Sequence, residues 1–204
     1  EVAPEQMKPG SIYNSNRFFL RGLLHRLGCE VSDLGIVPDQ REATLQALSN
    51  AAQDHDLILT SGGVSVGEED HIKPAVQALG HLDLWQIGMK PGKPFAHGRV
   101  GHAHFIGLPG NPVSSFVTFL LFVRPFILKL QGRDANQSQS YLIRADFNWL
   151  KADRRNEFLR VKLNSHGGLD LYPNQSSGVL TSASWGDGLV DCPPNQPINA
   201  GDLV

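Results

Sequence analysis

Hydrophobic residues recur at helical spacing in four stretches of the chain. In the first of these, Phe18, Leu20, Leu23, Leu24 and Leu27 form an apolar stripe, which Gly28 ends. The same period predicts helices over residues 14–27, 39–53, 70–79 and 112–131.

Short apolar or alternating runs, typical of strands, lie between these helices. The predicted strands cover residues 30–37, 56–60, 82–89, 95–100 and 104–108. Residues 56–60 are closed by Gly62-Gly63, which is the form of a buried parallel strand. Alternation of strands and helices is the signature of an α/β layer fold. We therefore expect an α/β domain of three layers with a mostly parallel sheet.

The pattern changes after Gly132, where helical periodicity disappears and short alternating runs stand between turn signals. We expect strands in these runs and a hairpin turn at His166-Gly167-Gly168. The predicted strands cover residues 142–147, 157–163, 169–172 and 188–191. The sequence thus predicts an α/β domain over residues 1–134 and a small, all-β, barrel-like domain over residues 135–204.

Composition narrows the function classes. The chain of 204 residues has 18 Lys and Arg against 20 Asp and Glu, without the basic excess of proteins that bind nucleic acid or anionic membranes. Any anion site must therefore be local. The longest apolar stretch, residues 116–123, is far shorter than the ~20 residues that cross a bilayer, so we interpret it as part of a core helix.

The two cysteines and the first residue bear on localisation. Cys29 and Cys192 lie far apart and form no C-x-x-C pair, so we expect free, buried thiols in a reducing cytoplasm. The chain opens with Glu1 rather than with a methionine or a basic-apolar signal, which indicates no secretion and suggests a fragment or a processed chain.

Three glycine-rich turns each follow a short apolar run: Ser61-Gly62-Gly63, residues 90–94 and residues 107–112. Strands of an open α/β sheet end at a common edge, where loops far apart in sequence meet. The N–H groups of a glycine turn approach a phosphate closely, and a following helix adds its positive end. We expect one anion-binding rim for a phosphate-bearing ligand. For the first turn, the alternative is a tight turn that binds no ligand. Its sequence matches neither a Walker A loop nor the G-x-G-x-x-G motif.

Acidic residues stand beside the first turn, at Glu68, Glu69 and Asp70. A magnesium ion would reconcile them with a phosphate, since Mg²⁺ bridges carboxylates and phosphate oxygens. Alternatively, they favour the first turn of a helix through its dipole. Asp39, between a predicted strand and a predicted helix, has the same two interpretations, with helix capping as the second.

The second and third turns are both stiffened by proline. Lys90 and Lys93 flank Pro91-Gly92, and their ammonium groups could meet a phosphate or an oxyanion; solvated surface lysines are the alternative. The third turn packs two prolines and two glycines into residues 107–112, which prescribes a particular backbone path. His102-x-His104 lacks a third ligand nearby, so no zinc site is expected.

Six segments, taken in order, closely resemble the MoeA family of molybdopterin molybdenumtransferases, whose animal counterpart is the gephyrin E domain. They are Ile12-Tyr13-Asn14-Ser15-Asn16-Arg17, residues 61–70, Lys90-Pro91-Gly92-Lys93-Pro94, residues 107–114, Arg155-x-Glu157-Phe158-x-Arg160 and Gln175-Ser176-Ser177-Gly178. The resemblance implies a molybdopterin-binding, MogA-like domain followed by the C-terminal β domain. Gln86 stands where the family pattern leads us to expect a second lysine.

The resemblance also implies a reaction, the Mg²⁺-dependent insertion of molybdate into adenylylated molybdopterin with release of AMP. By position, Asp39 and Asp70 look like acidic residues near the metal and the nucleotide, Lys90 like a cation for molybdate or phosphate, and Asp70 with Glu68 like the metal ligands. The residues that would bind adenylylated molybdopterin are Ser61, Gly62, Gly63, Ser65, Gly67, Lys93, Pro109, Gly110, Asn111, Pro112 and Ser177.

Family members carry a further N-terminal region, about as long as this chain, which contributes to dimerisation and to the active cleft of the partner subunit. The resemblance therefore implies a ligand-binding fragment of an enzyme that is a homodimer at full length, with small-molecule substrates and a contact with molybdopterin adenylyltransferase. Two other functions stay open: a molybdopterin adenylyltransferase, whose single domain shares the α/β fold, and a binding or scaffold module like the gephyrin E domain.

Overall fold

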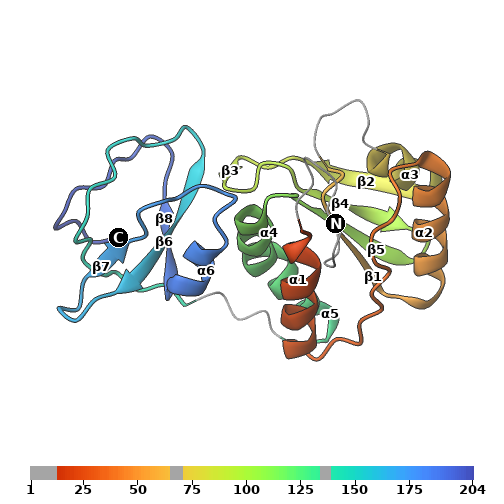
Figure 1. Ribbon diagram of the computed structural model, residues 1–204, viewed down its shortest axis with the longest axis horizontal. Coiled ribbons are helices and arrows are strands. Elements are labelled where there is room, and N and C mark those ends of the chain that lie inside the picture. Colours follow the sequence, from red (N-terminus) through yellow and green to blue (C-terminus); the bar gives the residue numbers. More distant parts are fainter. Residues whose placement is uncertain (1–12, 65–70, 134–138) are drawn as a thin grey trace. The chain divides into compact units, whose positions relative to one another are not determined.

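The computed structural model describes residues 13–64, 71–133 and 139–204, drawn in colour in Figure 1. The chain divides into two compact units. The first comprises the chain up to Gln86 together with Pro94–Gly110, and the second comprises Ile87–Lys93 together with Asn111–Val204. The predicted boundary between residues 134 and 135 lies outside the described residues and stays a prediction.

The first unit is built on a four-stranded sheet of order β1-β5-β4-β2. The strands are β1 (Leu57–Ser61), β2 (Gly80–Trp85), β4 (Ala96–Val100) and β5 (Ala103–Leu108). β1 and β5 are parallel, whereas β4 pairs antiparallel with both β5 and β2. The turn at Gly101 and His102 is too short for a parallel crossover, so β4 and β5 form a hairpin. The α/β class is confirmed, and the described sheet is mixed rather than mostly parallel.

Three helices cover this sheet in a three-layer arrangement. The α2 helix (Arg41–Asp54) and the α3 helix (Ile72–Leu79) lie on one side of the sheet, and α1 (Ser15–Arg26) lies on the other (Figure 1). The apolar faces of α2 and α3 pack with the sheet into one buried core, because period-3.6 and period-2 patterns each leave one face apolar. Its fully buried members include Val76, Ala96 and Phe105.

Residues 30–37 form no strand, contrary to the prediction. Leu34, Ile36 and Val37 are exposed, and Leu34 is 59% exposed. The Asp33 carboxylate accepts hydrogen bonds from the Gly35 N–H at 3.0 Å and from Arg17 Nε at 2.7 Å. Gly35 adopts a φ of +74°. This local turn interrupts the extended path that the alternating sequence predicted.

The second unit is organised around β6 (Asn156–Leu163). Its antiparallel partners are β7 (Leu169–Leu171) and β8 (Gly188–Cys192), and β3 (Met89–Lys90) pairs with it in parallel. The predicted strand over residues 82–89 is thus split between two sheets. Residues 142–147 form only isolated bridges, at Arg144 and Ala145. A short helix, α6 (Thr181–Trp185), was not predicted.

One long helical run of the second unit comprises α4 (Pro112–Thr118), the π-helical turn η1 (Phe119–Val123) and α5 (Arg124–Leu130). The helix widens just before Pro125, which has no N–H to donate. By length and composition the run Pro112–Leu130 could span a membrane, with a mean hydropathy of 1.7. Half of the run is buried within the protein, as in the predicted core helix.

Candidate functional site

The first and third glycine turns meet at one edge of the sheet in the first unit. Ser61 and Leu108 are register partners at the carboxyl ends of β1 and β5. The Gly62 N–H donates to the Leu108 carbonyl at 2.9 Å, and a Cβ placed on Gly110 would lie 3.7 Å from the Gly62 Cα. Gly62 and Gly63 have φ values of +93° and +67°, which glycine adopts readily. The expected meeting of these two turns is confirmed.

Asn16 joins the two turns from the first turn of α1. Its Nδ2 donates to Ser61 Oγ at 2.6 Å and to the Gly110 carbonyl at 2.8 Å, and the residue is only 5% exposed. The neighbouring Asn14 caps the helix, since its side chain accepts from the Arg17 N–H at 3.2 Å. Sequence reasoning quoted Asn16 within a family motif without giving it a role. The sequence places this asparagine at a helix start, but its burial and its partners depend on tertiary structure.

Asp39 lies at the surface before α2, with its side chain 78% exposed. The predicted alternative, that Asp39 caps the helix, is wrong, because Gln40 is the N-cap residue and no side chain caps α2. Asp39 Oδ1 is 4.0 Å from His71 Nε2, and His71 precedes α3. Asp39 thus lies beside His71, the residue that directly follows positions 65–70. The predicted site residues Ser65, Gly67, Glu68 and Asp70 lie outside the described residues.

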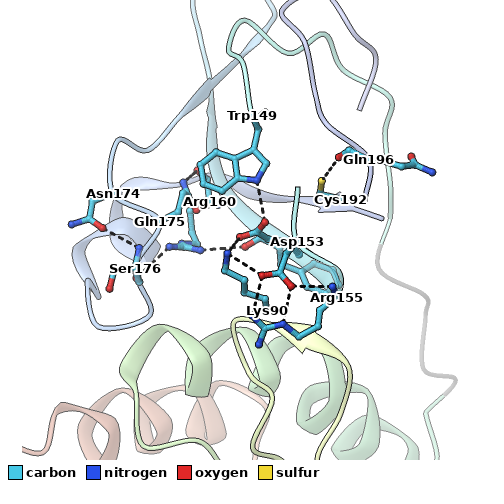
Figure 2. A network of polar contacts seen from close by, with 12 residues as sticks. Lys90, Trp149, Asp153, Arg155, Arg160, Asn174, Gln175, Ser176, Cys192 and Gln196 are labelled. Carbon is cyan, nitrogen blue, oxygen red and sulfur yellow. Dashed lines mark hydrogen bonds and ion pairs between the residues drawn. The ribbon is translucent and has the colours of Figure 1, made fainter. Parts of the chain in front are cut away.

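Lys90 is the centre of an ionic network in the second unit (Figure 2). Its Nζ is 2.9 Å from Glu157 Oε1 and 3.3 Å from Asp153 Oδ2. Arg155 binds both oxygens of Asp153, at 2.9 and 3.0 Å. The buried Glu157 also accepts a hydrogen bond from Trp149 Nε1 at 3.0 Å. Lys90 is therefore held in place by two carboxylates, with its side chain 38% exposed.

This network sets the protonation states. Partial burial acts to lower the pKa of Lys90, but Glu157 and Asp153 more than offset it, so the pKa is raised. The hydrogen bonds from Arg155 hold the pKa of Asp153 well below its usual range. Lys90 is therefore an ammonium ion with compensated charge. Lys93 is exposed, and no ion pair holds it within the described ranges.

The start of α4 brings Ser177 to the end of the third turn. The Val113 N–H donates to the Ser177 carbonyl at 2.9 Å, and Pro112 occupies the first turn of the helix. Pro109 is buried, whereas Asn111 is exposed as the N-cap residue. Ser177 and Pro112, which are 65 positions apart in the sequence, therefore lie close together.

Arg160 holds the loop that carries Ser177. Its guanidinium donates to the Ser176 carbonyl at 3.3 Å and to Ser182 Oγ at 3.2 Å, while its N–H donates to Gln175 Oε1 at 2.9 Å. Burial lowers the pKa of Arg160 to about 10. Figure 2 shows the guanidinium beside this loop. Arg160 thus gives the Gln175–Ser177 backbone a defined path, which sequence reasoning could not assign to it.

Metal and thiol sites are limited in the described part of the chain. No group of three His, Cys, Asp or Glu side chains that could hold a metal ion occurs there. Cys29 and Cys192 are free, as predicted; Cys192 is buried and Cys29 is half-buried. Burial raises the pKa of both thiols, so neither has the character of an activated nucleophile.

Two family models match nearly the whole chain. Residues 1–129 match a probable molybdopterin binding domain, and residues 143–204 match the MoeA C-terminal region, domain IV. Among similar proteins, the molybdopterin molybdenumtransferase of Haemophilus influenzae is 43% identical over 81% of this chain and 42% of its own length. The molybdenum cofactor synthesis protein cinnamon of Drosophila melanogaster is 35% identical over 92% of this chain and 32% of its own length.

Solved structures agree with these matches. Two crystal structures of the molybdopterin biosynthesis MoeA protein from Pyrococcus horikoshii superpose with TM-scores of 0.81 and 0.78, at 28% and 21% identity. Both cover 99% of this chain and 49% of the MoeA chain. The chain thus spans less than half the length of each of these relatives.

Proposed function

The chain belongs to the MoeA family of molybdopterin molybdenumtransferases, and on this premise we propose that it forms the ligand-binding part of such an enzyme. The reaction is the insertion of molybdate into the dithiolene of adenylylated molybdopterin, with release of AMP. Molybdate and adenylylated molybdopterin are the substrates. The observation that carries the proposal is the meeting of the first and third turns at the ends of β1 and β5, where Asn16 joins them.

The ligand lies against backbone groups of these turns. Gly62 and Gly63 both have left-handed backbone conformations, and Gly62 carries no Cβ that would hinder a phosphate at the main chain. Pro109 and Pro112 give the third turn a rigid path, and Ser177 lies at the start of α4. We assign the predicted ligand contacts to Ser61, Gly62, Gly63, Ser65, Gly67, Lys93, Pro109, Gly110, Asn111, Pro112 and Ser177.

Magnesium is the ion that we propose for the first unit. Mg²⁺ binds in proteins through one or two carboxylates and completes its shell with water and phosphate oxygens, so no three-residue cluster is needed. The exposed carboxylate of Asp39, beside His71, suits such a shell. Asp39, Asp70 and Glu68 are the residues that would hold the ion. When bound, Mg²⁺ supplies positive charge to the phosphoanhydride that is cleaved.

Lys90 supplies a positive charge from a side chain rather than from a metal ion. Its ammonium group has three N–H donors, and two carboxylates compensate its charge in the structure. The pair with Glu157 fixes the direction of the side chain, so an oxyanion can bind without first ordering the lysine. We assign to Lys90 the contact with a molybdate or phosphate oxygen.

The proposal extends to the whole enzyme. In full-length form we expect a cytoplasmic homodimer that receives adenylylated molybdopterin from molybdopterin adenylyltransferase. The compartment rests on the free cysteines, and the dimer rests on family membership.

Calorimetric titration tests the proposal. We expect this chain to bind adenylylated molybdopterin, more tightly with Mg²⁺, and the full-length protein to release AMP when molybdate is added. Formation of adenylylated product from ATP and molybdopterin would show an adenylyltransferase instead. Capture of a peptide by the β part, together with no pterin binding, would show a scaffold module. Either result would overturn the proposal.

A further inference from the structure

The orientation of the Asn16 amide is fixed by its neighbours. The Gly110 carbonyl oxygen can only accept a hydrogen bond, so the Asn16 group that faces it at 2.8 Å must be the Nδ2 donor. The second Nδ2 proton is directed at Ser61 Oγ, at 2.6 Å. Both donors of the amide are therefore used within the protein, and the Oδ1 atom faces a different direction.

The Oδ1 atom of Asn16 is buried and has no donor within hydrogen-bonding distance anywhere in the described part of the chain. Buried polar atoms in native proteins nearly always have a partner, and an unmet acceptor disfavours the folded state. The unpaired Oδ1 of Asn16 lies where two glycine turns meet, and the residue is only 5% exposed. A hydrogen-bond donor brought here by a ligand would satisfy Oδ1.

We propose that Asn16 Oδ1 accepts a hydrogen bond from adenylylated molybdopterin, and thereby orients it beside the first and third turns. This inference rests on the proposed function. The partner must carry an N–H or O–H group, because phosphate and molybdate oxygens at neutral pH are acceptors and would be repelled by Oδ1. The donor is therefore an amino or ring N–H of a heterocycle or a hydroxyl of the ribose, and Asn16 discriminates against an oxyanion at this point.

The test removes the acceptor from the protein and the donor from the ligand in one cycle. Calorimetry would compare wild-type full-length protein with Asn16→Ala. The probes are AMP, its 2′-deoxy and 3′-deoxy forms, purine riboside 5′-monophosphate, 6-hydroxymethylpterin and the N2-dimethyl form of this pterin. The expected result is a rise of about tenfold in Kd for one parent probe on Asn16→Ala, with its donor-deleted form binding both proteins equally. The affected pair identifies the donor.

Two further variants separate ligand recognition from folding. Asn14→Ala removes the side chain that caps α1 and leaves Oδ1 of Asn16 in place, so it should preserve the discrimination between the parent probe and its donor-deleted form. Asn16→Ser, which shortens the side chain and removes Oδ1, serves if Asn16→Ala fails to fold; it should bind the parent probe and its donor-deleted form equally. Equal losses for every probe on Asn16→Ala would mean that water or a protein group satisfies Oδ1, and the inference would be wrong. Failure of all probes and of adenylylated molybdopterin to bind the wild-type protein would instead overturn the proposed function itself.

Discussion

Lys90 and Glu157 are register partners of the parallel strands β3 and β6, and their side chains meet at 2.9 Å. Glu157 is buried and has a second partner in Trp149, so Glu157→Gln leaves an oxygen acceptor for only one of the two donors and turns its NH2 group toward the other. We expect Glu157→Gln to lower the free energy of unfolding by ~1–3 kcal/mol in urea titrations. Trp149→Phe, which keeps the ion pair, should cost ~1 kcal/mol.

A double-mutant cycle with Lys90→Met checks that the Glu157 effect passes through the ion pair. The double variant should lose less stability than the sum of the two single variants, because either substitution alone removes the same contact. Strict additivity would show that Lys90 and Glu157 act independently.

Gly63 lies in the left-handed region, and a Cβ there would be 2.7 Å from Ile72 Cγ1. Gly63→Ala should therefore destabilise the protein by ~1–2 kcal/mol and weaken binding of adenylylated molybdopterin. The matched control is Gly22→Ala within α1, where a Cβ meets open space. That change should stabilise the protein by ~0.5–1 kcal/mol. Equal thermal midpoints for the two variants would contradict the strained geometry at Gly63.

The lowered pKa of Asp146 predicts part of the loss of folding stability at low pH. Its carboxylate accepts from Arg144 Nε at 2.7 Å and from Asn164 Nδ2 at 2.8 Å, which lowers its pKa from 3.8 to about 2. A depressed folded-state pKa means that the ionised group stabilises the fold above about pH 4, and that this contribution disappears as the pH falls toward 2. Unfolding titrations of Asp146→Asn should show a shallower loss of stability across this window. A curve parallel to that of the wild type would refute the assignment.

Asp39 is predicted to matter for binding and little for stability. Because its side chain is 78% exposed, Asp39→Asn should change the free energy of unfolding by less than ~0.5 kcal/mol. In calorimetry with Mg²⁺, we expect a rise of about tenfold in the Kd for adenylylated molybdopterin, equal to ~1.4 kcal/mol. Asp54→Asn, at the end of α2, is the control and should leave the Kd unchanged. An equal effect of the two variants would exclude a specific role for Asp39.

Asp70→Asn tests the predicted metal ligand in the full-length protein. We expect Mg²⁺-dependent AMP release to be abolished, since the amide lacks the negative charge that Mg²⁺ prefers in a ligand. Single-turnover assays, followed by chromatography of AMP, measure the step directly. Release at the wild-type rate would remove Asp70 from the metal site.

The sequence predicted the elements that depend on local periodicity. Helix α1, strands β1 and β5 and the hairpin at residues 166–168 follow from apolar spacing and glycine position. The split of residues 82–89 between two sheets was not predictable, because periodicity does not identify a strand's partner. Residues 30–37 alternate like a strand, yet the Asp33 turn prevails there.

In the candidate site too, local backbone geometry could be predicted from the sequence and tertiary contacts could not. Backbone geometry at Gly62 and Gly63 could be inferred from residue type, because glycine alone adopts such φ values freely. The side-chain partners could not: Lys90 pairs with carboxylates more than 60 positions away, and Asn16 bridges turns that are 45 and 94 positions away. Such contacts depend on tertiary structure and leave no local pattern.

The route of the chain limits how it can be divided by engineering. Because Ile87–Lys93 and Asn111–Leu130 belong to the same compact unit as the C-terminal strands, the polypeptide crosses from one unit to the other three times before residue 134. A truncation that kept only residues 135–204 would leave β6 without the strand that carries Lys90 and Ser177 without the helix start at Val113. A transplantable cassette of the β part must therefore include both inserted segments, joined by a linker that replaces residues 94–110.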